Sequence, residues 1–395
     1  MEMNFSKKMQ NMKPSAIREI FKSLGMPGAI SFAAGNPAPE SFPVEALSKL
    51  AADIFAGDST NALQYSVTEG YPPLRELVAA RLKERFAIDT DNNMTLITSG
   101  GQQAIELCCK VMCNEGDVVI CENPSFIGAL NAFRSLGAKP VGVELEADGI
   151  SIEGLEAALK ANPNARFLYL IPTFHNPAGI TMSLEKRRAV YALAQQYDVL
   201  ILEDNPYGDL RFAGEELPTL KSMDTDGRVL YCSTFSKILS AGMRVGYACG
   251  NEELLQKMVI AKQVEDVHTN IFFQMLCAKY MQEYDLEQHI ATIRELYRHK
   301  CSLMLEMLDK YMPKEVTYTR PEGGLFLWCT LPDSLPLGEL INDLKEQGVF
   351  VVPGTTFNCD ETVPSSSFRL NYSTPSEEQI ERGIKTLCET IRKKL

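Results

Sequence analysis

The chain has 395 residues, of which 45% are hydrophobic and 23% charged, and its formal net charge is −12. This length predicts two domains or one large domain with a smaller lobe, and the acidic charge argues against nucleic acid or an anionic membrane as a main partner. We expect a soluble protein of the cytoplasm, because no apolar run reaches membrane-spanning length and the eleven cysteines lack a paired CxxC motif, which indicates buried thiols rather than a metal site.

The N-terminal 45 residues are expected to form an arm rather than a domain. A helix is predicted near residues 16–24, and a loop rich in Ala and Pro follows at residues 33–39. We expect this arm to fold onto the smaller lobe or onto a neighbouring subunit.

Short β-branched runs alternate with helical patterns from about residue 91 to residue 250. Strands are expected at 94–98, 117–121, 167–171 and 199–203, with helices that begin near Gln102, Ile127 and Ser183. Strands that are apolar on both faces are typical of a parallel sheet covered by helices. This region is therefore predicted to be an α/β domain.

Beyond residue 251 the pattern changes to long helices and then to an α+β lobe. A helix over about 285–311 is expected to join the two parts, because its apolar residues recur at helical spacing. Strands are expected at 316–319, 325–330 and 368–371, and helices at 337–347 and 376–393. We therefore predict an arm over 1–45, a large domain over 46–290 and a small C-terminal domain over 291–395.

The strongest chemical signal is Lys237, at the end of the run Ser-Thr-Phe-Ser-Lys over residues 233–237. A lysine amine acts as a covalent catalyst when a carbonyl is held beside it and its proton can be removed. The run predicts a lysine that forms an imine with the aldehyde of pyridoxal phosphate (PLP). Nearby hydroxyl groups and Arg244, in Gly-Met-Arg-Val-Gly, would hold the phosphate. A lysine flanked by serine is also common in surface loops.

A second segment, Thr-Ser-Gly-Gly-Gln-Gln-Ala over residues 98–104, follows a predicted strand and opens a helix. Such a turn directs the backbone N–H groups of Gly100, Gly101 and Gln102 and the positive end of the helix dipole at a bound phosphate. It is neither a dinucleotide fingerprint nor a Walker loop, and an ordinary strand-to-helix turn has the same pattern.

A carboxylate and two hydrogen-bonding side chains stand at further predicted strand ends. Asp204 follows a buried strand, where it faces a ligand crevice and can pair with a protonated pyridine nitrogen, which makes the ring an electron sink. Tyr207 and Asn176 can hydrogen-bond the phenolic oxygen of the ring. The surrounding segments, 205–208 and 175–179, are also typical of β-turns.

One aromatic residue and two arginines complete the candidate site. Phe126 lies just past a strand end and is expected either to stack on the cofactor or to belong to the core. Arg244 is suited to a phosphate, whereas Arg369 lies among apolar strand residues and needs an anionic partner such as a carboxylate.

Together these segments resemble the fold-type I PLP-dependent aminotransferases of class I/II over essentially the whole chain. The chain looks closest to the branch that contains 2-aminoadipate and kynurenine aminotransferases. The matching signatures are Gln64-Tyr65-Ser66 with Gly70, the segments 99–103, 176–179 and 237–244, Asp204 with Tyr207, Pro321-Glu322-Gly323-Gly324, and Phe368-Arg369. The resemblance implies a large α/β domain with a mainly parallel, seven-stranded type of sheet and a smaller α+β C-terminal lobe.

The resemblance also implies roles for individual residues. Lys237 would carry the cofactor, whose phosphate would be held by the backbone of Gly101 and Gln102 and by Thr234, Ser236 and Arg244. Tyr65 would reach the phosphate of the other subunit, which implies a homodimer with shared active sites.

The substrate side of the site follows from the same resemblance. Arg369 would bind the α-carboxylate of the substrate, with help from Asn176 and the backbone of Gly35. Arg18 matches a residue that can meet the far end of the substrate, although a solvated helix arginine has the same pattern.

Three positions depart from the pattern of the branch. Gly101 stands where a hydroxyl residue is frequent, His175 stands where Gln is frequent, and Phe126 stands where Tyr is frequent. None of the three removes cofactor binding, but substrate preference can differ from that of the named members.

The expected activity is a ping-pong transamination between an amino acid and a 2-oxo acid such as 2-oxoglutarate. The donor is expected to be aminoadipate, an aromatic or branched-chain amino acid, or several of these. Two alternatives remain open at the level of sequence. One is a PLP-dependent C–S β-lyase on the same fold, and the other is a non-enzymatic, effector-binding module like that of certain transcription regulators, which place a DNA-binding domain before this region.

Overall fold

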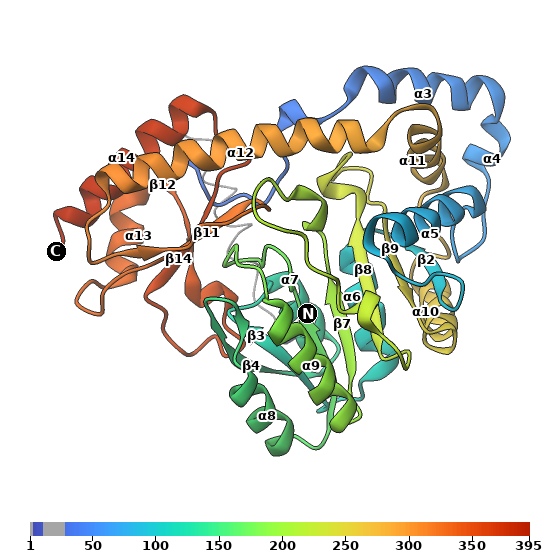
Figure 1. Ribbon diagram of the computed structural model, residues 1–395, viewed down its shortest axis with the longest axis horizontal. Coiled ribbons are helices and arrows are strands. Elements are labelled where there is room, and N and C mark those ends of the chain that lie inside the picture. Colours follow the sequence, from blue (N-terminus) through green and yellow to red (C-terminus); the bar gives the residue numbers. More distant parts are fainter. Residues whose placement is uncertain (1–2, 11–27) are drawn as a thin grey trace.

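The computed structural model describes residues 3–10 and 28–395, and its largest unit is an eight-stranded sheet (Figure 1). Its strands, in spatial order, are β2 (Met94–Thr98), β9 (Gly246–Gly250), β8 (Val229–Thr234), β7 (Leu200–Asp204), β6 (Ala165–Leu170), β3 (Val118–Asn123), β4 (Lys139–Glu146) and β5 (Gly149–Ile150). The run from β8 to β4 is parallel, whereas β9 is antiparallel to both neighbours and β5 to β4. The sheet is therefore mainly parallel, as predicted.

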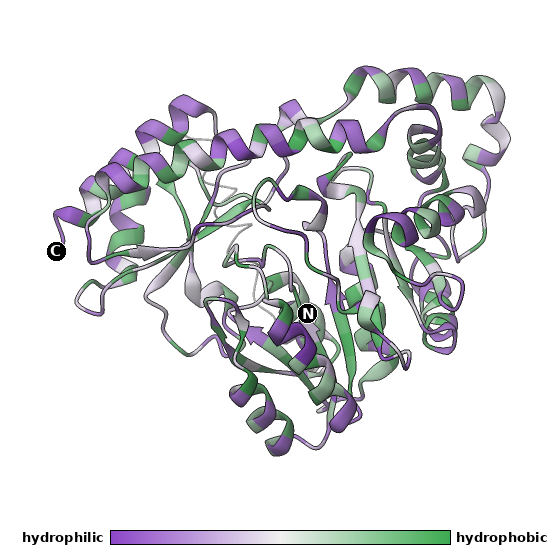
Figure 2. Cartoon of the chain, in the orientation of Figure 1, coloured by the Kyte–Doolittle hydropathy of each residue, from purple (hydrophilic) through white to green (hydrophobic). Residues whose placement is uncertain are grey.

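Helices cover both faces of this sheet, because its strands are apolar on both sides. On one face α6 (Gly101–Met112), α7 (Ile127–Ser135) and α10 (Glu252–Glu265) pack on side chains such as Phe167 and Leu202. On the other face α8 (Ile152–Ala161) and α9 (Leu184–Gln196) pack on Ile120 and Leu168. Figure 2 shows the interior strands mostly apolar and the outer helices striped, as burial of a single helix face requires.

Four further helices of the large unit lie together beside β2, at one edge of the sheet (Figure 1). They are α3 (Val44–Gly57), α4 (Ser59–Leu63), α5 (Pro72–Phe86) and α11 (Ile271–Glu283), and the four-residue helix α1 (Lys7–Gln10) stands apart from them in the sequence. The long helix α12 (Leu286–Tyr311) then runs from this end toward the C-terminal lobe (Figure 1). It begins where the side chain of Asp285 accepts a hydrogen bond from the backbone N–H of Gln288 at 2.9 Å.

The C-terminal lobe contains a four-stranded antiparallel sheet in the order β10 (Thr317–Tyr318), β11 (Phe326–Thr330), β14 (Ser367–Asn371) and β13 (Val352–Pro353). Helices α13 (Leu337–Glu346) and α14 (Glu377–Arg392) pack against it. Strand β1 (Ile30–Ser31) pairs in parallel with β12 (Val349–Phe350), so this part of the N-terminal arm folds onto the lobe. The helix expected at 16–24 lies outside the described residues, and the domain division at 45 and 290 stays a prediction.

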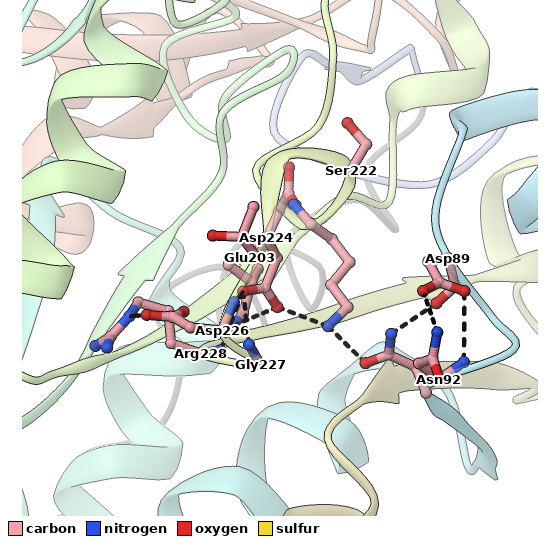
Figure 3. A network of polar contacts seen from close by, with 12 residues as sticks. Asp89, Asn92, Glu203, Ser222, Asp224, Asp226, Gly227 and Arg228 are labelled. Atoms are coloured by element: carbon pink, nitrogen blue, oxygen red, sulfur yellow. Dashed lines mark hydrogen bonds and ion pairs between the residues drawn. The ribbon is translucent and has the colours of Figure 1, made fainter.

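The loop that leads into β8 is fastened by buried charges (Figure 3). The side chain of Asp224 accepts hydrogen bonds from the backbone N–H groups of Gly227 and Val229, at 3.0 and 3.1 Å. Lys221 donates to Asp224 and to Asn93, both at 2.8 Å. These contacts fix the start of the strand whose other end leads to Lys237.

Two further findings hold for the described residues. None of their helices combines the length and the apolarity that a membrane crossing requires. Their eleven cysteines are all free thiols, and no group of three or more His, Cys, Asp or Glu side chains is arranged to hold a metal ion.

Candidate active site

A cavity of about 320 Å³ lies where the carboxyl ends of the parallel strands face the C-terminal lobe. Ligands of open α/β sheets bind at this edge. The residues predicted from the sequence that line it are Gly35, Gly101, Gln102, Phe126, Asn176, Asp204, Tyr207, Thr234, Ser236, Lys237, Arg244 and Arg369. Segments more than 300 residues apart in the chain thus meet in one place.

Lys237 projects into this cavity from a short 3-10 helix (Phe235–Lys237) that directly follows β8. Thr234 caps this turn, because its hydroxyl accepts a hydrogen bond from the backbone N–H of Ser236 at 3.0 Å. The amine of Lys237 donates to the carbonyl of Gly35 at 2.9 Å. Burial, together with the charges of Arg244 and Arg369, lowers the pKa of Lys237 to about 8. Roughly a tenth of the amine is therefore uncharged at pH 7, and about half at pH 8.

Asp204 stands at the end of β7 and is buried. Its Oδ2 accepts a hydrogen bond from the hydroxyl of Tyr169 at 2.7 Å, and its Oδ1 accepts from the thiol of Cys232 at 3.6 Å. Burial raises the pKa of Asp204 to about 6, and both donors oppose that rise. The carboxylate is thus held ionised and aimed at the cavity near neutral pH. Sequence reasoning missed Tyr169 and Cys232, because both look like core residues of buried strands.

Arg369 lies across the cavity on β14 and is 2% exposed. Its Nη1 donates to Oδ1 of Asn176 at 2.8 Å, and its Nη2 donates to the carbonyl of Ala33 at 2.7 Å, whereas its buried Nε has no hydrogen-bond partner among the described residues. The guanidinium lies over the rings of Phe326 and Phe357, 4.2 and 4.9 Å from their centroids. Such a group is positioned for a planar anion.

Asn176 and Tyr207 form the wall between Arg369 and Lys237. Nδ2 of Asn176 donates to the hydroxyl of Tyr207 at 3.4 Å, and the Tyr207 ring meets Phe326 edge to face. The turn after Asn176 requires Gly179, because φ is +71° there and an added Cβ would lie 2.3 Å from the carbonyl oxygen of Phe326. Burial raises the pKa of the Tyr207 hydroxyl, which therefore acts as a neutral donor.

The other end of the cavity is a cradle of backbone and hydroxyl groups at the start of α6. The N–H groups of Gly101 and Gln102, at the first positions of this helix, have no intrahelical partners, and no N-cap side chain accepts from them. Gly100 has φ +79°, and an added Cβ there would lie 2.2 Å from Nη2 of Arg244. Arg244 in turn donates to the hydroxyl of Ser236 at 3.3 Å. This arrangement suits a phosphate.

Two of the predicted residues that the structure describes do not line the cavity, namely Gly100, which directly precedes the lining residue Gly101, and Tyr65. Tyr65 follows α4 and is 81% exposed, with its ring edge-on to His268 at a centroid distance of 5.9 Å. Arg18 lies outside the described residues. Phe126, by contrast, lines the cavity at the start of α7 and is half-buried.

His175, one of the three departures from the branch pattern, is buried behind Asn176. Its Nδ1 accepts a hydrogen bond from the backbone N–H of Ala178 at 3.3 Å, and its Nε2 lies 3.3 Å from Oε2 of Glu122. The His175 ring therefore supports the turn that contains Asn176, and it does not line the cavity.

A family model described as aminotransferase class I and II matches residues 27–387. The chain belongs to this family of aminotransferases. Among its relatives, aromatic-amino-acid aminotransferase 1 of Thermococcus litoralis is 39% identical over 100% of this chain and 95% of its own. The 2-aminoadipate transaminase of Thermus thermophilus is 39% identical over 98% of this chain and 96% of its own. The solved kynurenine aminotransferase of Pyrococcus horikoshii, in complex with PMP, is 39% identical with a TM-score of 0.95 and covers 99% of this chain and 97% of its own.

The cofactor of this aminotransferase is pyridoxal phosphate, and its cavity fits that molecule. The cradle beside Gly100 has no room for a Cβ and offers N–H groups and an arginine to a phosphate. Asp204 supplies a buried carboxylate for a ring nitrogen, and Lys237 supplies an amine of lowered pKa for an aldehyde. The fold is that of fold-type I enzymes, as the sequence predicts.

Proposed function

We propose that this aminotransferase moves the amino group of an L-amino acid onto a 2-oxo acid such as 2-oxoglutarate in two successive half-reactions. The observation that carries the proposal is the placement of Arg369, whose buried Nε lacks a partner, on the same cavity as the amine of Lys237. An α-carboxylate bound by Arg369 would place the α-carbon of the substrate between the two side chains. A buried guanidinium that keeps one N–H without a partner is stabilised by an anionic ligand.

The residues that would hold the cofactor divide by its three parts. The N–H groups of Gly101 and Gln102, with Thr234, Ser236 and Arg244, would hold the phosphate. Asp204 would pair with the ring nitrogen and Phe126 would stack on the ring, while Asn176 and Tyr207 would donate to its phenolic oxygen. When bound, the cofactor supplies an electron sink that weakens the bonds to the α-carbon of the amino acid.

Lys237 would act twice, first as the covalent attachment of the cofactor and then as a proton carrier. Its uncharged amine would be the base that takes the proton from the α-carbon of the substrate, and its ammonium form would hold that proton beside the cofactor. Two features of the chain prepare it: burial lowers the pKa of the amine to about 8, and the Gly35 carbonyl orients it at 2.9 Å. Asp204 would remain ionised through the cycle because Tyr169 and Cys232 donate to it.

The substrate would be held at the opposite wall. Arg369 would bind the α-carboxylate through Nε and a second N–H of its fork, and Asn176 and the backbone of Gly35 would assist. Phe326 and Phe357 exclude water from that ion pair, which strengthens it. Arg18 is kept as the candidate for the far end of the substrate.

We also propose a homodimer with shared active sites, in the reducing cytoplasm. Exposed apolar side chains gather on α3, α4, α10 and the segments beside them, namely Phe55, Leu63, Tyr65, Val67, Ile260, Val264 and Val267. Large exposed apolar side chains that lie together are typical of protein interfaces, and we propose that these side chains contact the partner subunit. Tyr65 is one of these side chains and would reach the phosphate of the partner subunit.

The donor is proposed to be an aromatic amino acid, aminoadipate, a branched-chain amino acid or several of these. Three relatives at the same 39% identity have names that refer to three different substrates, so overall similarity does not choose among them. The test is a panel of half-reactions with single amino acids, read from the visible absorbance of bound cofactor, followed by product analysis with and without 2-oxoglutarate. Amino transfer that depends on the acceptor supports the proposal, whereas pyruvate and ammonia from a cysteine conjugate without acceptor would indicate a C–S lyase.

A further inference from the structure

A buried lysine lies behind the phosphate cradle, between α6 and α10. The side chain of Lys262 is 0% exposed, and its ammonium donates to both carboxylate oxygens of Asp266 at 2.8 Å and to Oε1 of Gln103 at 2.7 Å. By contrast, the lysine–carboxylate pair Lys160–Glu156, at the same helical spacing, lies on the surface. Burial lowers the pKa of Lys262 and Asp266 opposes that shift. A charge so completely desolvated calls for a specific reason.

The same groups bind the segment that forms the cradle. Oε1 of Gln103 also accepts the backbone N–H of Ser99 at 2.8 Å, and Nε2 of Gln103 donates to Oδ2 of Asp266 at 2.9 Å. The hydroxyl of Ser99 donates to the same Oδ2 at 2.7 Å. Ser99 directly precedes Gly100, so Asp266 anchors the entry of the cradle through two separate contacts.

The position of the Asp266 carboxylate beside the cradle has an electrostatic cost for phosphate binding. A carboxylate close behind a phosphate site repels a phosphate dianion, and a partly buried charge is poorly screened by salt. It also opposes the positive end of the α6 dipole. The ammonium of Lys262 donates to both oxygens of Asp266 and compensates the negative charge of this carboxylate.

We propose that Lys262 is a positioning residue for the cofactor phosphate, because it neutralises the carboxylate that anchors Ser99 and Gln103. The inference rests on the proposed role of the cradle at Gly101 and Gln102 in holding that phosphate. It assigns to Lys262 no contact with the cofactor itself.

The test compares Lys262→Met with Lys110→Met in the full-length protein. Lys110 pairs with Glu265 at 2.8 Å and joins the same two helices. Glu265 also accepts from Nε2 of Gln103 at 3.3 Å, but Lys110 itself bonds to Glu265 and not to Ser99, Gln103 or Asp266, so it is the control for loss of a lysine charge at this helix pair. The dissociation constant for PLP is measured by titrating protein stripped of cofactor, with the fluorescence of the single tryptophan, Trp328, as the signal. Lys262→Met is expected to weaken PLP binding about 10- to 100-fold, as loss of an outer-shell partner does in metal sites, and Lys110→Met less than about twofold.

A second variant separates charge from packing. Lys262→Met combined with Asp266→Asn removes both charges and is expected to recover affinity to within about fivefold of the wild type. The dissociation constant for inorganic phosphate is measured by its competition with PLP. It is expected to rise in Lys262→Met and to recover in the double variant. Should Lys262→Met fail to fold, Lys262→Gln, which also removes the charge, is measured in its place with the same expected loss of affinity.

Two results would overturn the proposal: unchanged PLP affinity in Lys262→Met, or a double variant as weak as the single one, which would indicate lost packing. Failure of the wild type to bind PLP at all would instead refute the proposed function, so the two failures are distinguishable.

Discussion

Replacement of Arg369 by lysine tests the substrate end of the site most sharply. Two nitrogens of the guanidinium already serve Asn176 and Ala33, and Nε has no partner among the described residues. Lysine keeps the charge but loses the fork. One charge-assisted hydrogen bond contributes about 1.5–3 kcal/mol, and about 1.4 kcal/mol is tenfold, so kcat/KM for an amino acid should fall about 10- to 150-fold.

The upper end of that range is expected, because Asn176 and the carbonyl of Ala33 would each be left without a donor in a buried place. The assay is the rate of the first half-reaction with an amino acid and with the amine that lacks its carboxylate. Arg369→Lys should reduce the preference for the amino acid over the amine far more than it reduces the affinity for PLP, which Arg369 reaches only through Asn176. Arg320→Lys, at an exposed ion pair with Asp309, is the control. An equal loss for the amine would refute the assignment of the carboxylate to Arg369.

Three further outcomes follow from the site. Tyr169→Phe removes a donor that lowers the pKa of Asp204, so the acidic limb of the pH–rate profile should move to higher pH; an unchanged limb would contradict this. Gly100→Ala should weaken PLP binding by at least about tenfold, while Gly116→Ala, with φ +91° and open space around it, should leave that affinity unaltered. Because the pKa of Lys237 is lowered to about 8, the rate at which stripped protein attaches PLP should rise with pH up to about 8 and then level; a rise that continues to pH 10 would show an ordinary lysine.

Much of the large sheet could be predicted from sequence, because strands that are covered on both faces need continuous runs of apolar residues, which a short stretch of sequence shows. Strands such as Val118–Asn123 and Leu200–Asp204 are apolar on both faces, and polar side chains follow at their carboxyl ends. Asp204, at the end of β7, and Asn176, in the turn after β6, could therefore be predicted from the sequence. The antiparallel direction of β9 could not be found in the same way, since pairing direction depends on partners distant in the chain.

The residues that were missed share a different cause. Tyr169 and Cys232 occupy inward positions of buried strands, where an aromatic or a thiol is indistinguishable from core until its partner is known. Lys262 and Asp266 have the spacing of a surface ion pair, and only their burial between two helices reveals the connection to Ser99. Such networks are formed by tertiary contact and leave no local pattern.

The central claim is that the amine of Lys237 bonds covalently to pyridoxal phosphate. The most direct measurement is reduction of the cofactor-loaded protein with borohydride, followed by proteolysis and mass spectrometry of the peptides. We predict a phosphopyridoxyl group on the peptide that contains Lys237 and its loss in Lys237→Ala. A label on any other lysine, or a reduced protein of unmodified mass, would contradict the account.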